Sequence, residues 1–557
     1  MADEQKLPER PAEGAEGSAE GGEKLSKKAL KKLEKEREKA AKKAEQEKAA
    51  AEKKAQEDAN DVSKGKYGDT PLVGSGDYKP LSQKRFKLHE VAGVDNGTEV
   101  LVRCKVDNAR SQSAKLGFLL LSHGPDSIQA VVAASETISR QMVKFAANIP
   151  PESIVDVVGL AKDVPEPIKS ASISNKELHI VQIWVISRAI SKLPIQVADA
   201  DTRLPSEDKS AEQEEGGRAL VGLNTRLDNR VLDLRSPLNR AIFKVRNGVK
   251  KAFTQFLTER GFIDIDTPKL LGSPSEGGAN VFVVEYYKGK GYLAQSPQFY
   301  KEMAISAGFE RVFEISDVFR AEDSNTSRHL SEYTSMDLEM EFTDDYMEVV
   351  HLIRDLMHYI LATLAKNFSR EIEYVRGKYP SEPFKLPEKS EDIPIIEFEQ
   401  GCKWLNEAGI EVDDSDDVNS QQEKALGNIV REKFGTDVYI LNGYPHKARA
   451  FYTMPRNADL GSKYSNSFDF MMRGQEVLSG AQRIHDHVLL SKKMRSWQPP
   501  LDPESAGFKD YVDAFKYGCP PHAGGAFGLE RVVSNYLALQ NVRQASLFPR
   551  DPSRLTP

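Results

Sequence analysis

Residues 311–341 limit the possible folds more than any other stretch of the chain. An apolar segment ends at Arg320, a polar loop follows, and an alternating segment then returns with three carboxylates, Asp337, Glu339 and Glu341. Two such segments joined by a loop predict a β-hairpin. The loop carries guanidinium groups, which suit a polyphosphate. A solvated surface hairpin explains the same residues, so this segment alone does not decide the function.

Length and composition narrow the class of protein. A chain of 557 residues predicts about three domains. The three cysteines are far apart without a Cys-x-x-Cys pair, which fits a reducing compartment. The first thirty residues contain no apolar run, and nowhere do about eighteen apolar residues follow one another. We therefore expect a soluble cytoplasmic protein with no membrane partner.

The charge of the N-terminal region changes sign along the chain. Residues 1–23 hold seven acidic and two basic side chains, whereas residues 24–54 hold thirteen Lys or Arg and six Glu. The second stretch lacks Gly and Pro and predicts a solvated basic helix that is attracted to phosphates. A charged solubilising helix without a partner is the alternative. We expect residues 1–84 to comprise a disordered acidic tip, this helical extension and a linker.

Two further regions follow the linker. Residues 85–190 contain five short alternating segments with a helical patch after the third, which is the order of an OB-fold barrel that binds oligonucleotides. Residues 191–236 are irregular and charged, as in a hinge. Residues 237–557 combine hairpin-linked strands with amphipathic helices, which predicts an α+β domain with an antiparallel sheet flanked by helices. The pattern of residues 370–450 permits no assignment.

Two C-terminal segments add chemistry to the hairpin. Residues 524–531 form a glycine-rich run that ends in Glu530 and Arg531, and glycines allow a backbone to approach a ligand closely. A glycine-rich strand packed on a helix explains that run equally well. Asp469 and Glu476 lie upstream and have the carboxylate chemistry of Mg²⁺ ligands.

With these residues in view, the chain resembles class II aminoacyl-tRNA synthetases. Residues 261–268, 318–333 and 524–531 resemble the three motifs of that family in order and spacing. Within the family, the resemblance is to the aspartate-specific enzymes of the eukaryotic cytosol, fungal-type versions included. It covers roughly residues 85–557 and rests further on residues 274–278, 295–301, 479–487 and 546–552.

The resemblance implies an ATP site in which Arg320 and Arg531 are the catalytic residues. Arg320 is implied to hold the α-phosphate and the reacting carboxylate, and Arg531 the γ-phosphate and adenine. The implied ATP-binding set is Arg320, Glu322, Arg328, His329, Leu330, Tyr333, Glu476, Gly528, Leu529, Glu530 and Arg531. Asp469 and Glu476 are implied to bind Mg²⁺. Tyr333 replaces the usual Phe under the adenine, and Ala526 replaces a common Gly, which puts only fine nucleotide affinity in doubt.

For the amino acid, the resemblance implies that Lys301 and Arg483 meet the side-chain carboxylate of L-aspartate. The implied aspartate-binding set is Glu276, Ser296, Gln298, Lys301, Arg320, Asp337, Ser479 and Arg483. Asparagine has nearly the same shape, so charge must discriminate between the two, and buried cations facing a neutral amide would cost several kcal/mol. A lysine-specific site would need acids instead.

The resemblance also implies macromolecular partners. Phe118, Gln129 and Glu177 match residues that contact the anticodon of tRNA(Asp), with the catalytic domain and the basic helix as further tRNA contacts. Phe118 as an ordinary core residue is the alternative. Pro268 implies a homodimer interface. The expected activity is that of an aspartate–tRNA ligase, which forms aspartyl-adenylate from ATP and transfers it to the 3′-terminal hydroxyl. An asparaginyl or relaxed synthetase and an inactive RNA-binding relative are the alternatives.

Overall fold

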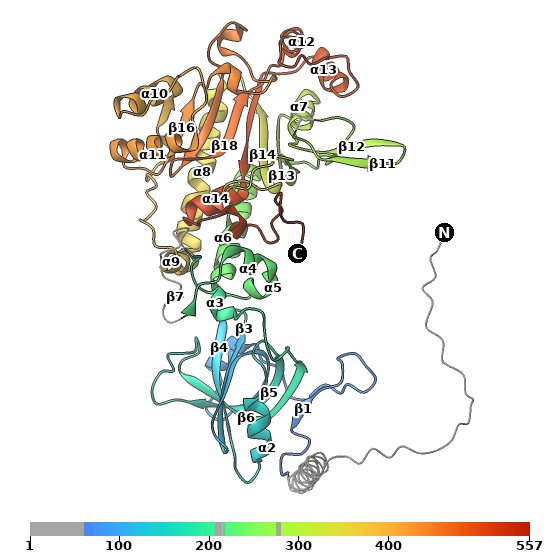
Figure 1. Cartoon of the computed structure of the whole chain (residues 1–557), viewed down its shortest axis with the longest axis vertical. Helices are drawn as coiled ribbons and strands as arrows, with labels where there is room; N and C mark the ends of the chain where they lie inside the picture. Colours follow the sequence, from blue (N-terminus) through green and yellow to red (C-terminus); the bar gives the residue numbers. More distant parts are fainter. Residues whose placement is uncertain (1–60, 206–213, 216–217, 275–279) are drawn as a thin grey trace, which may run out of the picture. The chain divides into compact units, whose positions relative to one another are not determined.

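The computed structural model describes residues 61–205, 214–215, 218–274 and 280–557 (Figure 1). The predicted basic helix at 24–54 and the predicted aspartate-binding residue Glu276 lie outside the described residues. The chain divides into two compact units between Lys192 and Leu193. None of the described helices combines the length and the apolar character that crossing a membrane requires.

The first unit is a closed β-barrel built from five main strands. These are β2 (Glu99–Ser113), β3 (Leu116–His123), β4 (Asp126–Ala133), β5 (Ile154–Asp163) and β6 (Lys176–Ser187). The sheet order is β1-β6-β4-β3-β2-β5, and pairing of β6 with β5 closes it. Helix α2 (Arg140–Ala147) follows β4 and begins at Ser139, whose side chain accepts a hydrogen bond from the Met142 amide. This order confirms the expected OB-fold.

Part of the predicted linker belongs to this barrel. Strand β1 (Tyr67–Asp69) pairs in parallel with β6. Ser63 is fully buried, and its hydroxyl accepts a hydrogen bond of 2.7 Å from the Ser139 amide. Tyr67 packs on Phe145 of α2 at a ring-centroid distance of 5.1 Å. This segment is attached to the barrel by backbone pairing and by one buried hydroxyl. Neither produces a repeating pattern of apolar residues, so the composition of the segment indicates a linker.

The second unit is organised around an eight-stranded sheet with the order β15-β16-β17-β18-β19-β14-β13-β9. Its strands are β9 (Ile263–Asp264), β13 (Arg311–Phe319), β14 (Glu332–Glu341), β15 (Ile395–Glu397), β16 (Val438–Asn442), β17 (Ser467–Met472), β18 (Gln475–Gln482) and β19 (His522–Gly528). Neighbouring strands are antiparallel except for β15–β16 and β13–β9. The sheet confirms the predicted α+β class and the predicted hairpin, β13–β14.

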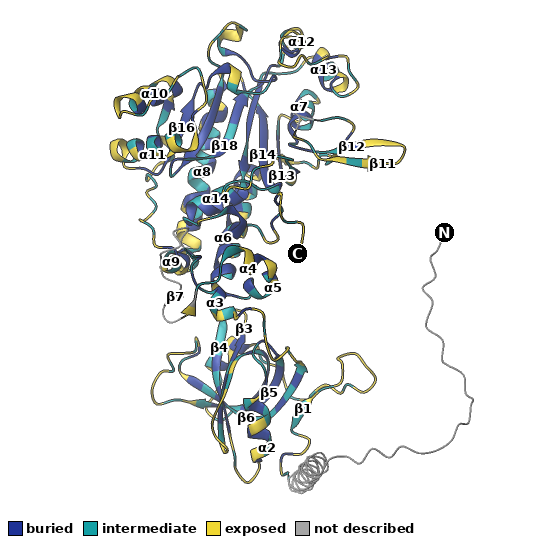
Figure 2. Ribbon diagram, viewed as in Figure 1, coloured by how far each residue is buried: buried dark blue, intermediate teal, exposed yellow. Residues whose placement is uncertain are grey.

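Helices cover the sheet and enclose its core. The main ones are α6 (Pro237–Thr258), α8 (Met347–Asn367) and α14 (Leu529–Tyr536). Phe253 of α6 meets Phe313 of β13 and Phe527 of β19 edge to face, at centroid distances of 5.9 and 6.1 Å. Figure 2 shows the central strands buried, whereas the hairpin of β11 (Val283–Tyr286) and β12 (Gly289–Leu293) is largely exposed.

The remaining elements of this unit are short. The predicted hinge contains α3 (Val197–Ala200), the two-residue strands β7 (Glu214–Glu215) and β8 (Arg218–Ala219), α4 (Leu223–Asp228) and α5 (Arg230–Asp233). Strand β10 (Leu270–Leu271) pairs with β12, and α7 (Gln298–Ser306) precedes β13. Helices α12 (His487–Arg495) and α13 (Lys509–Lys516) lie between β18 and β19 in the chain.

The segment 370–450, which the sequence left unassigned, extends the sheet. It supplies α9 (Ser369–Lys378), α10 (Phe398–Glu407), α11 (Ser420–Phe434), β15 and β16. Helices α10 and α11 lie beside β16 (Figure 1) and enclose a separate small core that includes Phe398, Leu426 and Tyr439. Helix α11 ends at Gly435, whose φ of 69° is favourable for glycine.

Candidate active site

One row of residues across four strands forms the floor of the candidate site. The strand register pairs Asp469 of β17 with Ser479 of β18, Ser479 with Ala526 of β19, and Ala526 with Asp337 of β14. Directly paired residues of an antiparallel sheet project from the same face. Residues that are up to 189 positions apart in the sequence are therefore aligned on one surface.

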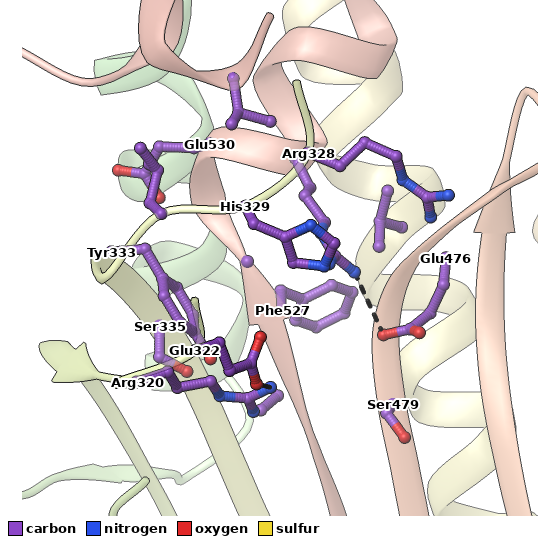
Figure 3. A pocket seen from close by; sticks show the side chains of 16 residues that line it. Arg320, Glu322, Arg328, His329, Tyr333, Ser335, Glu476, Ser479, Phe527 and Glu530 are labelled. Atoms are coloured by element: carbon purple, nitrogen blue, oxygen red, sulfur yellow. Dashed lines mark ion pairs between the residues drawn. The ribbon is translucent and has the colours of Figure 1, made fainter. Parts of the chain in front are cut away.

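Two adjoining cavities open above this row. The first is shown in Figure 3 and is lined by Arg320, Glu322, Arg328, His329, Leu330, Tyr333, Ser335, Glu476, Val477, Ser479, Ala526, Phe527, Gly528, Glu530, Arg531 and Val542. The second measures about 350 Å³ and is lined by Ser296, Gln298, Asp337, residues 448–450, Tyr452, Thr453, Gly480, Ala481 and Arg483. Six residues line both: Arg320, Tyr333, Ser335, Glu476, Ser479 and Ala526.

The first cavity combines aromatic surface with guanidinium groups. The Arg320 guanidinium lies 5.6 Å from the centre of the Tyr333 ring and 3.9 Å from a carboxylate oxygen of Glu322. Arg531 forms an ion pair with Glu476 at 3.6 Å, drawn as a dashed line in Figure 3. Flat rings and guanidinium groups are the groups that bind a purine and its phosphates.

The loop between β13 and β14 is attached to helix α11. The Arg328 guanidinium donates to Glu423 at 3.0 Å and also to Ser420. Burial raises the pKa of Glu423 above its ordinary value, although Arg328 opposes that shift. Burial, together with Arg531, lowers the pKa of the neighbouring His329. The unassigned segment thus supplies a carboxylate that fixes one of the predicted ATP-binding arginines.

The two predicted metal ligands fit a divalent cation. Asp469 is buried, and its Oδ1 has no hydrogen-bond partner among the described residues. Burial raises the pKa of Glu476 and the nearby charge of Asp469 raises it further, although Arg531 and Arg449 oppose this shift. No cluster of three or more His, Cys, Asp or Glu suited to a metal occurs in the described part of the chain. Two carboxylates plus substrate phosphates are a common Mg²⁺ environment.

Arg449 belongs to the site, although the sequence reasoning missed it. Its guanidinium donates to Ser479 Oγ at 2.7 Å and to Asp469 Oδ2 at 2.8 Å, and it lies 3.8 Å from the centre of the Tyr444 ring. Arg449 follows the short 3₁₀ helix His446–Ala448, in the region whose pattern could not be assigned. An isolated arginine in a loop gives no sequence signal, so only the fold connects it to Asp469.

A buried network of charged groups lies at the far end of the second cavity. Arg483 donates two hydrogen bonds to Glu339, at 3.0 and 3.2 Å. Lys301 Nζ lies 2.9 Å from Asp337 Oδ1 and 3.6 Å from Glu339 Oε2. Burial alone would raise the pKa of Glu339, but Arg483 and Lys301 hold it below the ordinary value. Arg483 and Asp337 line the cavity, whereas Lys301 is fully buried behind them.

His522 and Glu302 extend this network into the protein. The His522 ring is fully buried and lies 2.8 Å from the Pro520 carbonyl oxygen and 3.4 Å from Glu302. Burial would lower the pKa of His522, but the contacts with Cys519 and Glu302 raise it to about 10. Gln298 donates to Glu302 at 2.7 Å. With His522 protonated, three cations face three carboxylates: Lys301, Arg483 and His522 against Asp337, Glu339 and Glu302.

The other predicted site residues differ in whether they reach the cavities. Leu529 is fully buried in the core and does not line either cavity. Glu530 lines the first cavity, but its carboxylate accepts hydrogen bonds from Arg246 at 2.9 Å and from the Thr334 amide at 3.2 Å. Ser296 and Gln298 line the second cavity, and Leu330 and Gly528 line the first. Pro268 is exposed between β9 and β10.

The barrel has a separate hollow on its surface. Phe118 and Gln129 line it, together with Asn108, Arg110, Leu119, Leu120 and Ser170. The Arg110 guanidinium lies 5.5 Å from the centre of the Phe118 ring. Gln129 donates to Glu177 at 3.2 Å, so the three predicted anticodon residues are neighbours on β3, β4 and β6. A half-exposed ring beside an arginine suits a stacked nucleotide base.

Comparison with known proteins identifies the class. The family model "tRNA synthetases class II (D, K and N)" matches residues 222–552, so the chain belongs to this family. Aspartate–tRNA ligase, cytoplasmic, of Caenorhabditis elegans is 46% identical over 496 residues, which cover 89% of this chain and 91% of that protein. The human protein of the same name is 46% identical over 497 residues, covering 89% and 95%.

Solved structures lead to the same family. An aspartyl-tRNA synthetase from Entamoeba histolytica superimposes with a TM-score of 0.76 at 36% identity, covering 88% of this chain and 96% of that one. An asparaginyl-tRNA synthetase from Pyrococcus horikoshii, complexed with asparaginyl-adenylate, has a TM-score of 0.70 at 28% identity, covering 85% and 100%.

The buried network predicts a large effect of neutralising Glu339. We expect Glu339→Gln to lower the free energy of unfolding by about 3–5 kcal/mol, because Arg483 and Lys301 would lose a buried counter-charge. Urea unfolding measures this loss. The control is Glu371→Gln, whose partner Lys244 is exposed and whose removal should change stability by less than about 1 kcal/mol. Equal effects of the two substitutions would contradict the assigned importance of Glu339.

Proposed function

We propose that this protein is an aspartate–tRNA ligase of the cytoplasm, which joins L-aspartate to tRNA(Asp) with ATP as the second substrate. One observation carries the proposal. A cavity lined by Tyr333 and three guanidinium groups adjoins a second cavity lined by Arg483, and Arg320 lines both. Family membership and relatives named as aspartate–tRNA ligases, at 46% identity, support the same reaction.

The first step is formation of aspartyl-adenylate. The α-carboxylate of aspartate attacks the α-phosphorus of ATP, the bond to the β-phosphate oxygen breaks, and pyrophosphate leaves. Arg320 binds both the carboxylate and the α-phosphate, which holds the reactants in line and offsets the charge that develops on phosphorus. Arg531 binds the γ-phosphate, and Tyr333 stacks on adenine. Asp469 and Glu476 would hold Mg²⁺, which supplies further neutralisation of the phosphates.

Selection of aspartate rests on charge. Arg483, backed by Lys301, binds the side-chain carboxylate of aspartate, while Asp337 and Ser479 contact its α-amino group. Asparagine would place a neutral amide against cations that are largely buried. The cost of several kcal/mol corresponds to a discrimination of roughly a thousandfold. In the second step, the 3′-terminal hydroxyl of the tRNA takes the aspartyl group, and no protein nucleophile is needed.

The reaction is tested by ATP–pyrophosphate exchange with each of the twenty amino acids in the absence of tRNA. We expect exchange with aspartate alone, and its loss when EDTA removes divalent cations. Arg320→Ala should lower the exchange rate by about 10²–10³-fold, because a preorganised charge at the reacting phosphate is lost.

Arg311→Ala is the matched control, since Arg311 lies at the opposite end of strand β13. It should retain near-normal exchange. Equal exchange with asparagine would contradict the proposed selection by charge, and an active Arg320→Ala variant would contradict the proposed role of Arg320.

The barrel is proposed to bind the anticodon through Phe118, Gln129 and Glu177. Phe118→Ala should raise the KM for tRNA about 5–160-fold, because stacking of one base contributes about 1–3 kcal/mol. Exchange without tRNA should not change. Phe145→Ala, on helix α2 of the same barrel, controls for loss of packing. An unchanged KM in Phe118→Ala would contradict the proposed contact of Phe118 with the anticodon.

The protein is further proposed to be a homodimer that associates through residues 263–270. Strand β9 is at the edge of the sheet, and Ile263 and Leu270 are both nearly half exposed. Sedimentation velocity should give twice the chain mass of 62.0 kDa, and Ile263→Asp should shift the protein toward the monomer. Leu72→Asp, a substitution of an exposed leucine in the other unit, should not. A monomeric wild-type protein at micromolar concentration would refute the proposal.

A further inference from the structure

The catalytic unit contains a third cavity, of about 610 Å³, which the proposed reaction does not use. Its lining comes from the loop before α11, from the 3₁₀ helix His446–Ala448 and the loop near residue 460, and from the C-terminal end of α12. The described residues that line it are Ser415, His446, Lys447, Leu460, Ser462, Lys463, Lys493, Ser496, Trp497 and Gln498. Four of these are basic, and none is a carboxylate.

Lys493 is the residue that most needs an explanation. The residue is 5% exposed, and it forms no ion pair with a carboxylate among the described residues. Its Nζ lies 5.2 Å from the centre of the Trp497 ring, which is a weak substitute for a counter-ion. Burial lowers the pKa of Lys493 to about 8, so the ammonium form is held at a cost in stability.

His446 contributes a ring nitrogen without a hydrogen-bond partner to the same cavity. His446 is nine-tenths buried, and its Nδ1 has no hydrogen-bond partner within the described residues. Lys447 and Lys463 have counter-ions, because they pair with Asp416 at 2.5 Å and with Asp414 at 2.6 Å.

These two aspartates do not line the cavity. Lys493 is therefore the lysine of the lining that has no ion pair among the described residues, and both Lys493 and His446 remain available to a ligand.

We propose that this cavity binds a phosphate group carried by a nucleotide. Phosphate oxygens would accept hydrogen bonds from Lys493, from a ring N–H of His446 and from the hydroxyl of Ser462, and would supply a negative charge opposite Lys493. The volume is in the range of sites for nucleotide-sized ligands and exceeds what inorganic phosphate fills. The phosphate belongs either to a free mononucleotide or to the backbone of a single-stranded RNA.

The third cavity is separate from the second cavity, but one segment of the chain lines both. His446 and Lys447 line the third cavity, whereas Ala448, Arg449 and Ala450 line the second. A phosphate bound to His446 would therefore lie beside the segment that carries Arg449. This placement does not depend on which amino acid the enzyme activates. Phosphate binding in the third cavity can therefore be tested independently of the proposed function.

The test is trace acetylation of the full chain at pH 8, where Lys493 is partly neutral and reactive, followed by mass spectrometry. The probes are AMP, inorganic phosphate and a single-stranded trinucleotide, with adenosine and acetate as controls. We expect a phosphate-bearing probe to lower acetylation of Lys493 at least fivefold. Lys492, the exposed neighbour on α12, should keep its reactivity. Protection by AMP identifies a mononucleotide site, and protection by the trinucleotide alone identifies an RNA site.

A matched pair of variants adds a readout of structure. Lys493→Met should keep or raise the Tm, because it removes a buried charge without a partner, and should bind the protective probe at least tenfold more weakly. Lys492→Met should bind the probe normally. The proposal is overturned if no phosphate-bearing probe protects Lys493, if acetate protects it equally, or if Lys493→Met lowers the Tm while probe binding is unchanged.

Discussion

The paired hydrogen bonds from Arg483 to Glu339 are the interaction around which the catalytic unit is arranged. Both groups are buried, and a buried charge is tolerated only when partners surround it. The fold supplies those partners from α7, β14 and β19, and Arg483 directly follows β18. Even the glycine-rich strand serves this purpose, since a Cβ at Gly524 would lie 2.4 Å from a carboxylate oxygen of Glu339. The same ion pair presents Arg483 to the cavity in a fixed position.

Strand register places the residues of the candidate site side by side on one face of the sheet. Asp469, Ser479, Ala526 and Asp337 lie in one row, and the cavities for nucleotide and amino acid adjoin above it. Because strands are rigid elements with a fixed side-chain period, a one-residue slip would turn each of these side chains to the other face. Catalysis by positioning requires such rigidity, since the proposed mechanism asks for little covalent chemistry from the protein.

The segment between residues 395 and 450 has a larger part in the site than its sequence suggests. Glu423 holds Arg328 of the hairpin loop, and Arg449 joins Asp469 to Ser479. His446 and Lys447, in the short 3₁₀ helix that precedes Arg449, line the third cavity. This one segment thus contacts the hairpin loop at the first cavity, the predicted metal ligand Asp469 and the proposed phosphate site.

Elements whose signal is local, or is carried by a family motif, could be predicted from the order of the amino acids. The hairpin with Arg320, the glycine-rich strand before Arg531 and the five-strand barrel followed from periodicity and motif order. The tertiary structure alone decided which residues meet across the fold. It brought Arg449 to Asp469 and Glu423 to Arg328, buried Lys301 behind Asp337, and left Lys493 without a counter-charge. These contacts join residues far apart in the chain, and a lone charged residue in a loop or helix carries no period that reveals its partner.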